Sequence, residues 1–191
     1  AGYTVEGGKV TAAPEGAKLS YELIIPGEGT GDHPAFAIVT GARDSLSNIG
    51  MELVINDPAD SNILWDALDS GEQELWTAAW GTTIDPDMYQ VYHSNNIPGK
   101  EGSSESNHYH IQDPELDQLI MDARKSDDQN YRKALYKEAL EKIIEWAVEI
   151  PTYQRKNVII FSTERINIDT LTPDITTFWG WMNDIELVEM N

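Results

Sequence analysis

A pair of acids in a turn is the first feature of this chain that could perform acid–base chemistry. Asp85 and Asp87 flank Pro86, and a glycoside-active enzyme needs two carboxylates held at a set separation across a sugar. Neighbouring acids in a turn more often accept hydrogen bonds from the N–H groups of their own loop and of the next helix. We therefore interpret both acids as local caps, and an acidic glycoside-active enzyme using Asp85 or Asp87 stays as an alternative function.

Histidines could provide a second kind of chemistry, metal binding. His108 and His110 stand two residues apart, so they would project to one side of an extended segment, with His93 and Asp85 as possible further ligands. A single H-x-H pattern is a weak signal, so we predict no resident metal and no cofactor. Binding of nickel or a metal chelate as a solute stays as an alternative.

Nucleophilic catalysis has little support in the sequence. The chain contains no cysteine, which excludes a thiolate metal site and a cysteine nucleophile. The G-x-S-x-G motif of serine hydrolases and the Gly-rich phosphate loops are also absent from the sequence. We therefore predict no catalytic residues and a protein that binds rather than catalyses.

The stretch 75–94 has the composition of a ligand-binding cleft. A strand-like run stops at Gly81, and a turn rich in Thr, Asp and Pro follows it. The next segment is an aromatic cluster of Met88, Tyr89, Tyr92 and His93. Large amphipathic rings beside a constrained loop at the end of a strand commonly line a site for an organic ligand. Because Trp80 adjoins the Gly81 turn, we expect it to face such a cleft.

The net charge of −20 over 191 residues argues against two classes of partner. Nucleic acid binding needs a Lys/Arg surface, and anionic lipid likewise attracts basic segments. An acidic surface favours solubility or a cationic or neutral partner. No stretch of the sequence approaches the roughly 20 apolar residues of a membrane-spanning helix.

The first half of the chain alternates between strands and helices. We expect strands over 18–25, 51–56 and 74–80, a helix over 33–48 capped by Asp32, and a helix that starts at Asp60 or Ser61 and ends at Gly71. Helices of ten to fifteen residues between short strands predict an α/β layer with parallel pairing.

The second half opens with a polar loop over 95–112. A helix capped by Asp113, with Pro114 at its first position, is expected next. The longest helix follows, and its start has capping-box spacing at 126–129. Strands are predicted over 158–162 and 185–189, and no linker splits the chain.

Short matches to one protein family follow each other nearly from end to end. The matching segments are 1–3 (AGY), 19–25 (LSYELII), 47–53 (SNIGMEL), 80–87 (WG…DPD), 107–109 (NHY), 113–120 (DPELDQLI), 131–136 (YRKALY) and 150–153 (IPTY). In their order and spacing they resemble the C-terminal lobe of the family 5 extracellular solute-binding proteins. These are the oligopeptide-, dipeptide- and nickel-binding components of ABC importers.

The resemblance implies a fold and a function. The fold would be an α/β lobe of the periplasmic-binding-protein-like type II kind, with a mixed sheet flanked by helices. Residues 1–191 would form a single C-terminal lobe, a fragment of a longer chain whose N-terminal lobe is missing here. The whole protein would close on a solute, most simply an oligopeptide, and deliver it to an ABC permease. It would work at the extracellular face, tethered as a lipoprotein, or in the periplasm.

The resemblance also implies ligand-binding residues at or near the cleft. They are Trp80, Gly81, Thr82, Thr83, Asp85 and Tyr109. Peptide binders of the family often carry an aspartate just after Trp-Gly-x, where it pairs with the amino terminus of the ligand. This chain has Thr82-Thr83-Ile84 at that place, so its recognition of a free α-amine would need a charge supplied by Asp85 or by the other lobe.

Overall fold

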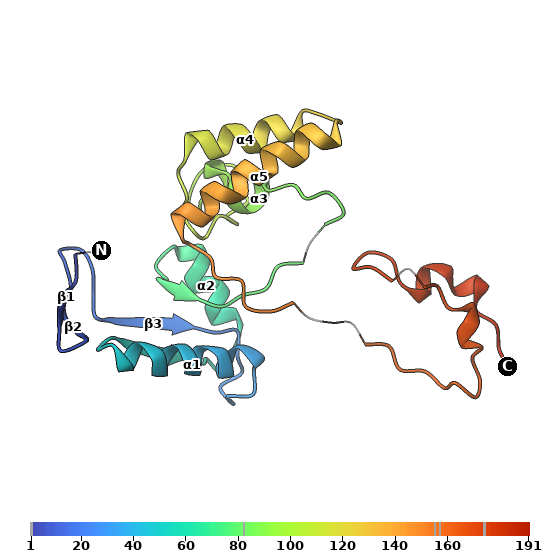
Figure 1. Cartoon of the computed structure of the whole chain (residues 1–191), viewed down its shortest axis with the longest axis horizontal. Helices are drawn as coiled ribbons and strands as arrows, with labels where there is room; N and C mark the ends of the chain where they lie inside the picture. The colour runs from blue at the N-terminus through green and yellow to red at the C-terminus, as the bar shows by residue number, and fades with distance from the viewer. Residues whose placement is uncertain (1, 82, 155, 157, 174) are drawn as a thin grey trace. The chain divides into compact units, whose positions relative to one another are not determined.

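The computed structural model describes residues 2–81, 83–154, 156, 158–173 and 175–191. The chain divides into two compact units (Figure 1). The first unit comprises Ala1–Trp80 and Asp87–Ile150, and the second comprises Gly81–Pro86 and Pro151–Asn191. Each unit is described by itself below.

A three-stranded parallel sheet forms the centre of the first unit. Its strand order is β4 (Glu52–Asn56), β3 (Ser20–Ile24) and β5 (Leu75–Trp76). Both neighbours run parallel to β3, which confirms the predicted β-α-β-α-β layer. The expected third strand over 74–80 is much shorter in the structure, because pairing to β3 ends with the Thr77 N–H bonded to the Ile24 carbonyl.

One helix covers each face of this sheet (Figure 1). Helix α1 (Pro34–Asn48) packs Ala35 and Val39 against Ile25. Helix α2 (Asn62–Ser70) packs its buried leucines against Ile24. Successive residues of a strand point to opposite faces, so the apolar pair Ile24-Ile25 supplies both cores. This arrangement confirms the α/β fold class.

The ends of these helices follow the local sequence with one exception. Gly71 ends α2 in the left-handed conformation, with φ of 70°, which a glycine adopts without strain. The predicted Asp32 cap of α1 is wrong. The cap is His33, whose Nδ1 accepts a hydrogen bond from the Ala35 N–H at 3.1 Å.

The Gly-rich lead contains a hairpin that was not predicted. Strands β1 (Thr4–Glu6) and β2 (Lys9–Ala12) pair antiparallel. Gly7 and Gly8 form the turn between them, both with positive φ, as a tight hairpin turn requires. Antiparallel pairing in the first unit is thus found in this hairpin rather than in the three-stranded sheet.

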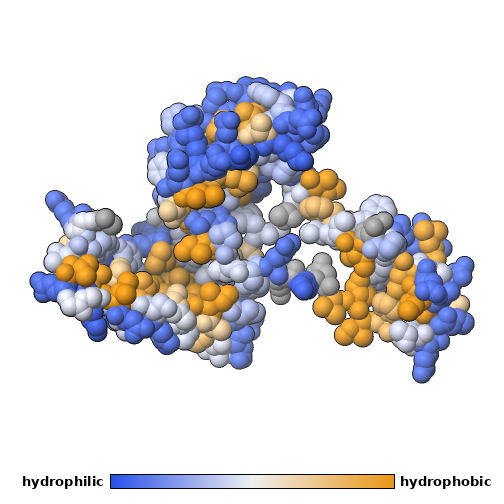
Figure 2. All heavy atoms as spheres, in the orientation of Figure 1, coloured by the Kyte–Doolittle hydropathy of each residue, from blue (hydrophilic) through white to orange (hydrophobic). Residues whose placement is uncertain are grey.

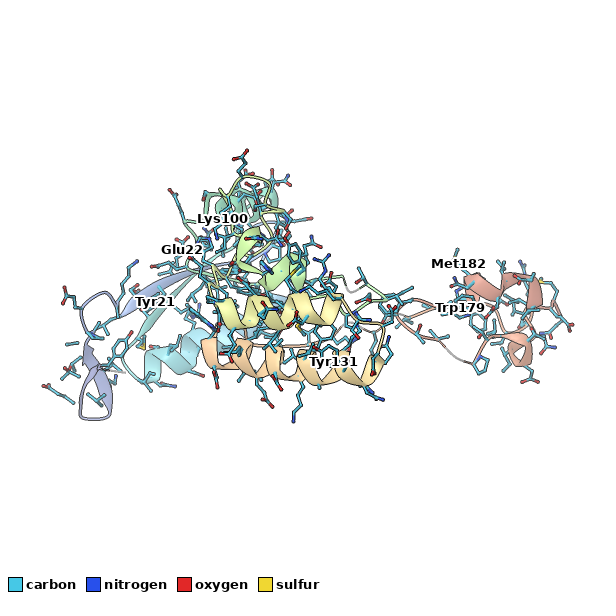
Figure 3. All side chains as sticks on the ribbon, turned by 90° about the horizontal axis from the view of Figure 1, so that it is seen from above. Tyr21, Glu22, Lys100, Tyr131, Trp179 and Met182 are labelled. Carbon is cyan, nitrogen blue, oxygen red and sulfur yellow. The ribbon has the colours of Figure 1, made fainter. Side chains whose placement is uncertain are left out.

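Two long helices complete the first unit and run side by side (Figures 1 and 3). They are α4 (Pro114–Arg124) and α5 (Gln129–Trp146), preceded by α3 (Tyr89–Tyr92) and a 3-10 turn, η1 (Ser94–Asn96). Asp113 caps α4 by accepting from the N–H groups of Glu115 and Leu116, as predicted. Asp128 caps α5, within the expected start at 126–129.

The second unit has little regular structure. It contains the 3-10 segments η2 (Ile168–Thr170) and η3 (Trp181–Leu187), and a single antiparallel bridge between Ile166 and Met190. No side chain in the described part of this unit is buried, and apolar atoms gather on its surface in Figure 2. Trp179 and Met182, labelled in Figure 3, are among those exposed.

The two strands predicted for this unit are wrong. Residues 158–162 form no strand, and Val158 and Ile160 are 79% and 92% exposed. The region 185–189 lies largely in η3. A strand needs a neighbouring strand to satisfy its backbone hydrogen bonds, and the described residues provide only the Ile166–Met190 bridge.

Candidate functional site

Three aromatic rings in the first unit stack into a column. Trp76 and Tyr109 stack with ring centroids 5.6 Å apart, and Tyr109 and Tyr92 stack at 5.7 Å with planes only 6° apart. Trp76 packs on the core beneath α2, whereas Tyr92 and Tyr109 pack on the core between α4 and α5. The column therefore joins the sheet layer to the helical pair, and all three rings remain only half-buried.

An exposed carboxylate accepts hydrogen bonds from two of the rings in this column. Glu149 Oε2 accepts a hydrogen bond from the Tyr92 hydroxyl at 2.7 Å and another from the Tyr109 hydroxyl at 3.1 Å. Burial, together with the neighbouring carboxylate, raises the pKa of both hydroxyls well above the usual tyrosine value. Both tyrosines therefore remain protonated donors at neutral pH, and they fix the position of the carboxylate.

Trp80 lies next to the same column. Its indole lies close enough to the Tyr109 hydroxyl to partly offset the rise in the pKa of that hydroxyl, and its side chain is 46% exposed. The structure therefore brings together Trp80 and Tyr109, two of the residues predicted to bind ligand. Trp80 does not lie on the strand predicted over 74–80, because β5 ends at Trp76.

The remaining predicted ligand-binding residues belong to the second unit or lie outside the description. Gly81, Thr83 and Asp85 are exposed residues of the second unit. The Thr83 hydroxyl donates to the Asp85 carbonyl at 2.6 Å, which tightens the turn between them. Thr82 lies outside the described residues. A ligand-binding role for this turn remains a prediction.

Asp87 has two structural partners. Its Oδ1 accepts from the Tyr89 N–H at 3.0 Å, and its Oδ2 pairs with Arg124 Nε at 3.1 Å. The guanidinium of Arg124 also lies over the Tyr89 ring, 4.3 Å from its centroid. These contacts fit the interpretation of Asp87 as a local cap, because both of its oxygens hold neighbouring parts of the fold.

Asn107 ties together the two segments that carry these tyrosines. It is fully buried, and its Nδ2 lies 3.2–3.3 Å from the carbonyls of Tyr92, His93 and Ile111. Its Oδ1 accepts from the Ile111 N–H, and its own N–H donates to the Asn96 carbonyl. This residue thus ties the end of α3, which carries Tyr92, to the loop before α4, which carries Tyr109.

The histidines are used separately rather than as a cluster. His93 is buried, accepts from the Asn95 N–H and packs on Tyr89. Burial lowers the pKa of His108, and His110 lies against Gly71. Among the described residues, no group of three or more His, Cys, Asp or Glu side chains is placed to hold a metal ion.

No motif in the sequence pointed to Glu149. Glu149 lies 57 residues from Tyr92 and 40 from Tyr109 along the chain, and no local pattern marks such a partner.

The structure also has a shallow depression of about 360 Å³ that contains none of the residues predicted to bind ligand. It is lined by Arg43, Asp44, Ser47, Met51, Glu52 and Leu53. In the described helices, no segment is both long and apolar enough to cross a membrane.

Comparison with solved structures shows that the parallel α/β layer and the pair of long helices share their fold with part of several binding proteins. The chain is similar to the oligopeptide-binding protein AppA from Bacillus subtilis, solved in complex with a nonapeptide, with a TM-score of 0.59 and 23% identity over 74% of this chain and 26% of that one. It is also similar to the periplasmic binding protein DppA from Helicobacter pylori in complex with the peptide STSA, with a TM-score of 0.56 and 23% identity over 68% of this chain and 24% of that one.

A third similar structure holds a metal chelate. It is NikA from Brucella suis in complex with Fe(III)-EDTA, with a TM-score of 0.57 and 21% identity over 77% of this chain and 28% of that one. The chain thus spans about a quarter of the length of these proteins. No protein-family model and no curated protein sequence matches it. The resemblance found in the sequence is therefore confirmed at the level of the fold.

Proposed function

We propose that this chain is the C-terminal lobe of a two-lobed solute-binding protein that captures an oligopeptide for an ABC importer. The observation that carries the proposal is the column of Trp76, Tyr109 and Tyr92 beside the exposed Trp80, in a fold shared with peptide-binding proteins. Half-buried rings provide apolar area for side chains of varied shape, while hydroxyl and indole groups offer hydrogen bonds.

The proposal extends to the parts of the protein outside this sequence. An N-terminal lobe would supply the opposite wall of the cleft, and an ABC permease in the membrane would receive the solute. The protein would act at the extracellular face as a lipoprotein or in the periplasm. Several similar structures come from proteins described as ABC transporter binding proteins or as periplasmic, which supports this setting.

Identification of the natural solute tests the proposal most directly. The full-length protein, purified from its host without denaturation, is examined by native mass spectrometry, and we expect a co-purified peptide. A bound metal chelate or sugar in place of a peptide would contradict the oligopeptide assignment. The enzyme alternative would be favoured instead if the protein hydrolysed a bound glycoside and if Asp85→Asn or Asp87→Asn abolished that hydrolysis.

The lobe assignment has a test of its own. Closure of two lobes around a solute provides contacts from both sides, so the 191-residue chain alone should fold but bind peptide feebly. Isothermal titration calorimetry measures the affinity of the separate chain for a peptide that has been identified on the full-length protein. A micromolar dissociation constant for the separate chain would contradict the assignment.

A further inference from the structure

Glu149 has no cationic partner in the described part of the chain. On the neighbouring helices, Arg124 pairs with Asp87, and Lys142 pairs with Asp113 and Glu115. Glu149 is exposed, and its described partners are the two tyrosine hydroxyls. Hydroxyl donors orient a carboxylate but leave its negative charge uncompensated.

The surroundings of this carboxylate match the chemistry that recognises a protonated amine. An ammonium group gains from a carboxylate through charge-assisted hydrogen bonds. Glu149 contacts two tyrosines whose rings stack with each other and with Trp76. The overall charge of −20 would also attract a cationic solute toward the protein.

We propose that Glu149, oriented by Tyr92 and Tyr109, binds a protonated amine of the solute. This inference rests on the proposed peptide-binding function and specifies which group of the peptide this lobe recognises. The two hydroxyls bind the same oxygen, Oε2. The other oxygen, Oε1, is therefore the acceptor that the amine would use.

A mixture of peptides tests the inference without knowledge of the natural solute. The full-length protein is incubated with a tryptic digest of casein, and separately with the same digest acetylated on its amines. Retained peptides are quantified by mass spectrometry. Because a hydrogen bond to a charged group contributes more than a neutral one, we expect the unmodified digest to be retained about tenfold better than the acetylated one.

Glu149→Gln should reduce this preference to less than about threefold, because the amide keeps the shape of the side chain and loses its charge. Glu145→Gln removes the same charge from an exposed position of α5 one turn earlier, and it should keep the preference. Tyr92→Phe should lower the preference partially, since it removes one of the groups that orient the carboxylate. Thermal unfolding followed by circular dichroism confirms that each variant is folded.

The outcomes separate the two proposals. If wild-type protein retains neither digest, the peptide-binding function is wrong and the inference that rests on it is wrong too. If wild type retains peptides and Glu149→Gln keeps the preference for free amines, the function stands and the role of Glu149 is refuted. A purely structural role would lower retention of both digests alike, and that result also refutes the inference.

Discussion

Replacement of Asn107 by alanine should destabilise the first unit strongly. The side chain is 0% exposed, and its amide faces the carbonyls of Tyr92, His93 and Ile111 and the N–H of Ile111. An amide has two N–H groups, so it satisfies two of these carbonyls at a time. Alanine would leave at least two carbonyls and one N–H without that partner in a buried region. At roughly 1 kcal/mol or more for each unsatisfied group, we expect a loss of about 2–4 kcal/mol.

Equilibrium urea denaturation of the 191-residue chain, followed by tryptophan emission, measures this loss. Asn95→Ala is the matched control, because Asn95 is exposed and only its backbone N–H bonds His93. That control should stay within about 0.5 kcal/mol of wild type. Asn107→Asp keeps the acceptor oxygen but turns a carboxylate toward the carbonyls, so it should be at least as harmful as alanine. An Asn107→Ala protein as stable as the Asn95→Ala control would refute the positioning role of this side chain.

The remaining predictions concern the cleft, a helix cap and a pH effect. Trp80→Ala should weaken solute binding by the full-length protein in calorimetry without lowering its melting temperature, and unchanged binding would show that Trp80 does not face the cleft. Asp113→Ala should cost about 1 kcal/mol of stability in urea at pH 7 through loss of the α4 cap, whereas a cost below about 0.3 kcal/mol would contradict the capping role. Burial lowers the pKa of His108 below its usual 6.5, so the unfolded chain binds the proton more readily, and stability should fall as the pH drops from 6.5 toward the folded pKa. His108→Gln should flatten this fall in thermal scans at pH 7.5 and 5.0, and an unchanged pH dependence would exclude His108 as its cause.

Sequence predicted those parts of the fold that depend on neighbouring residues. The cap at Asp113 followed by Pro114 and the glycine at the end of α2 are chemistry within a few residues, and the structure has both. The parallel layer also followed from local alternation of strands and helices. The cap of α1 was wrong because intrinsic preference favours Asp32 at an N-cap, whereas the helix begins at Pro34, which makes the preceding residue, His33, the cap.

The site was predictable only in part, because its key contacts join distant segments. Trp80 and Tyr109 were selected through a resemblance, and the structure places their side chains next to each other. Glu149 was not selected, since its tyrosine partners lie 40 and 57 residues away. The apolar run 158–162 was predicted as a strand for its composition. Composition does not supply a pairing partner, and the described residues of its unit do not pair with it.

The exposed run from Val158 to Phe161 has a consequence for handling the protein. Four consecutive exposed apolar residues with strand-forming side chains form a segment through which separate copies of a chain can pair as β-strands and aggregate. The charge of −20 opposes such encounters by mutual repulsion, which acts over about 30 Å at 0.01 M salt but only about 3 Å at 1 M. The tendency of the separate chain to aggregate therefore depends on ionic strength, and a buffer of low ionic strength should keep it dispersed.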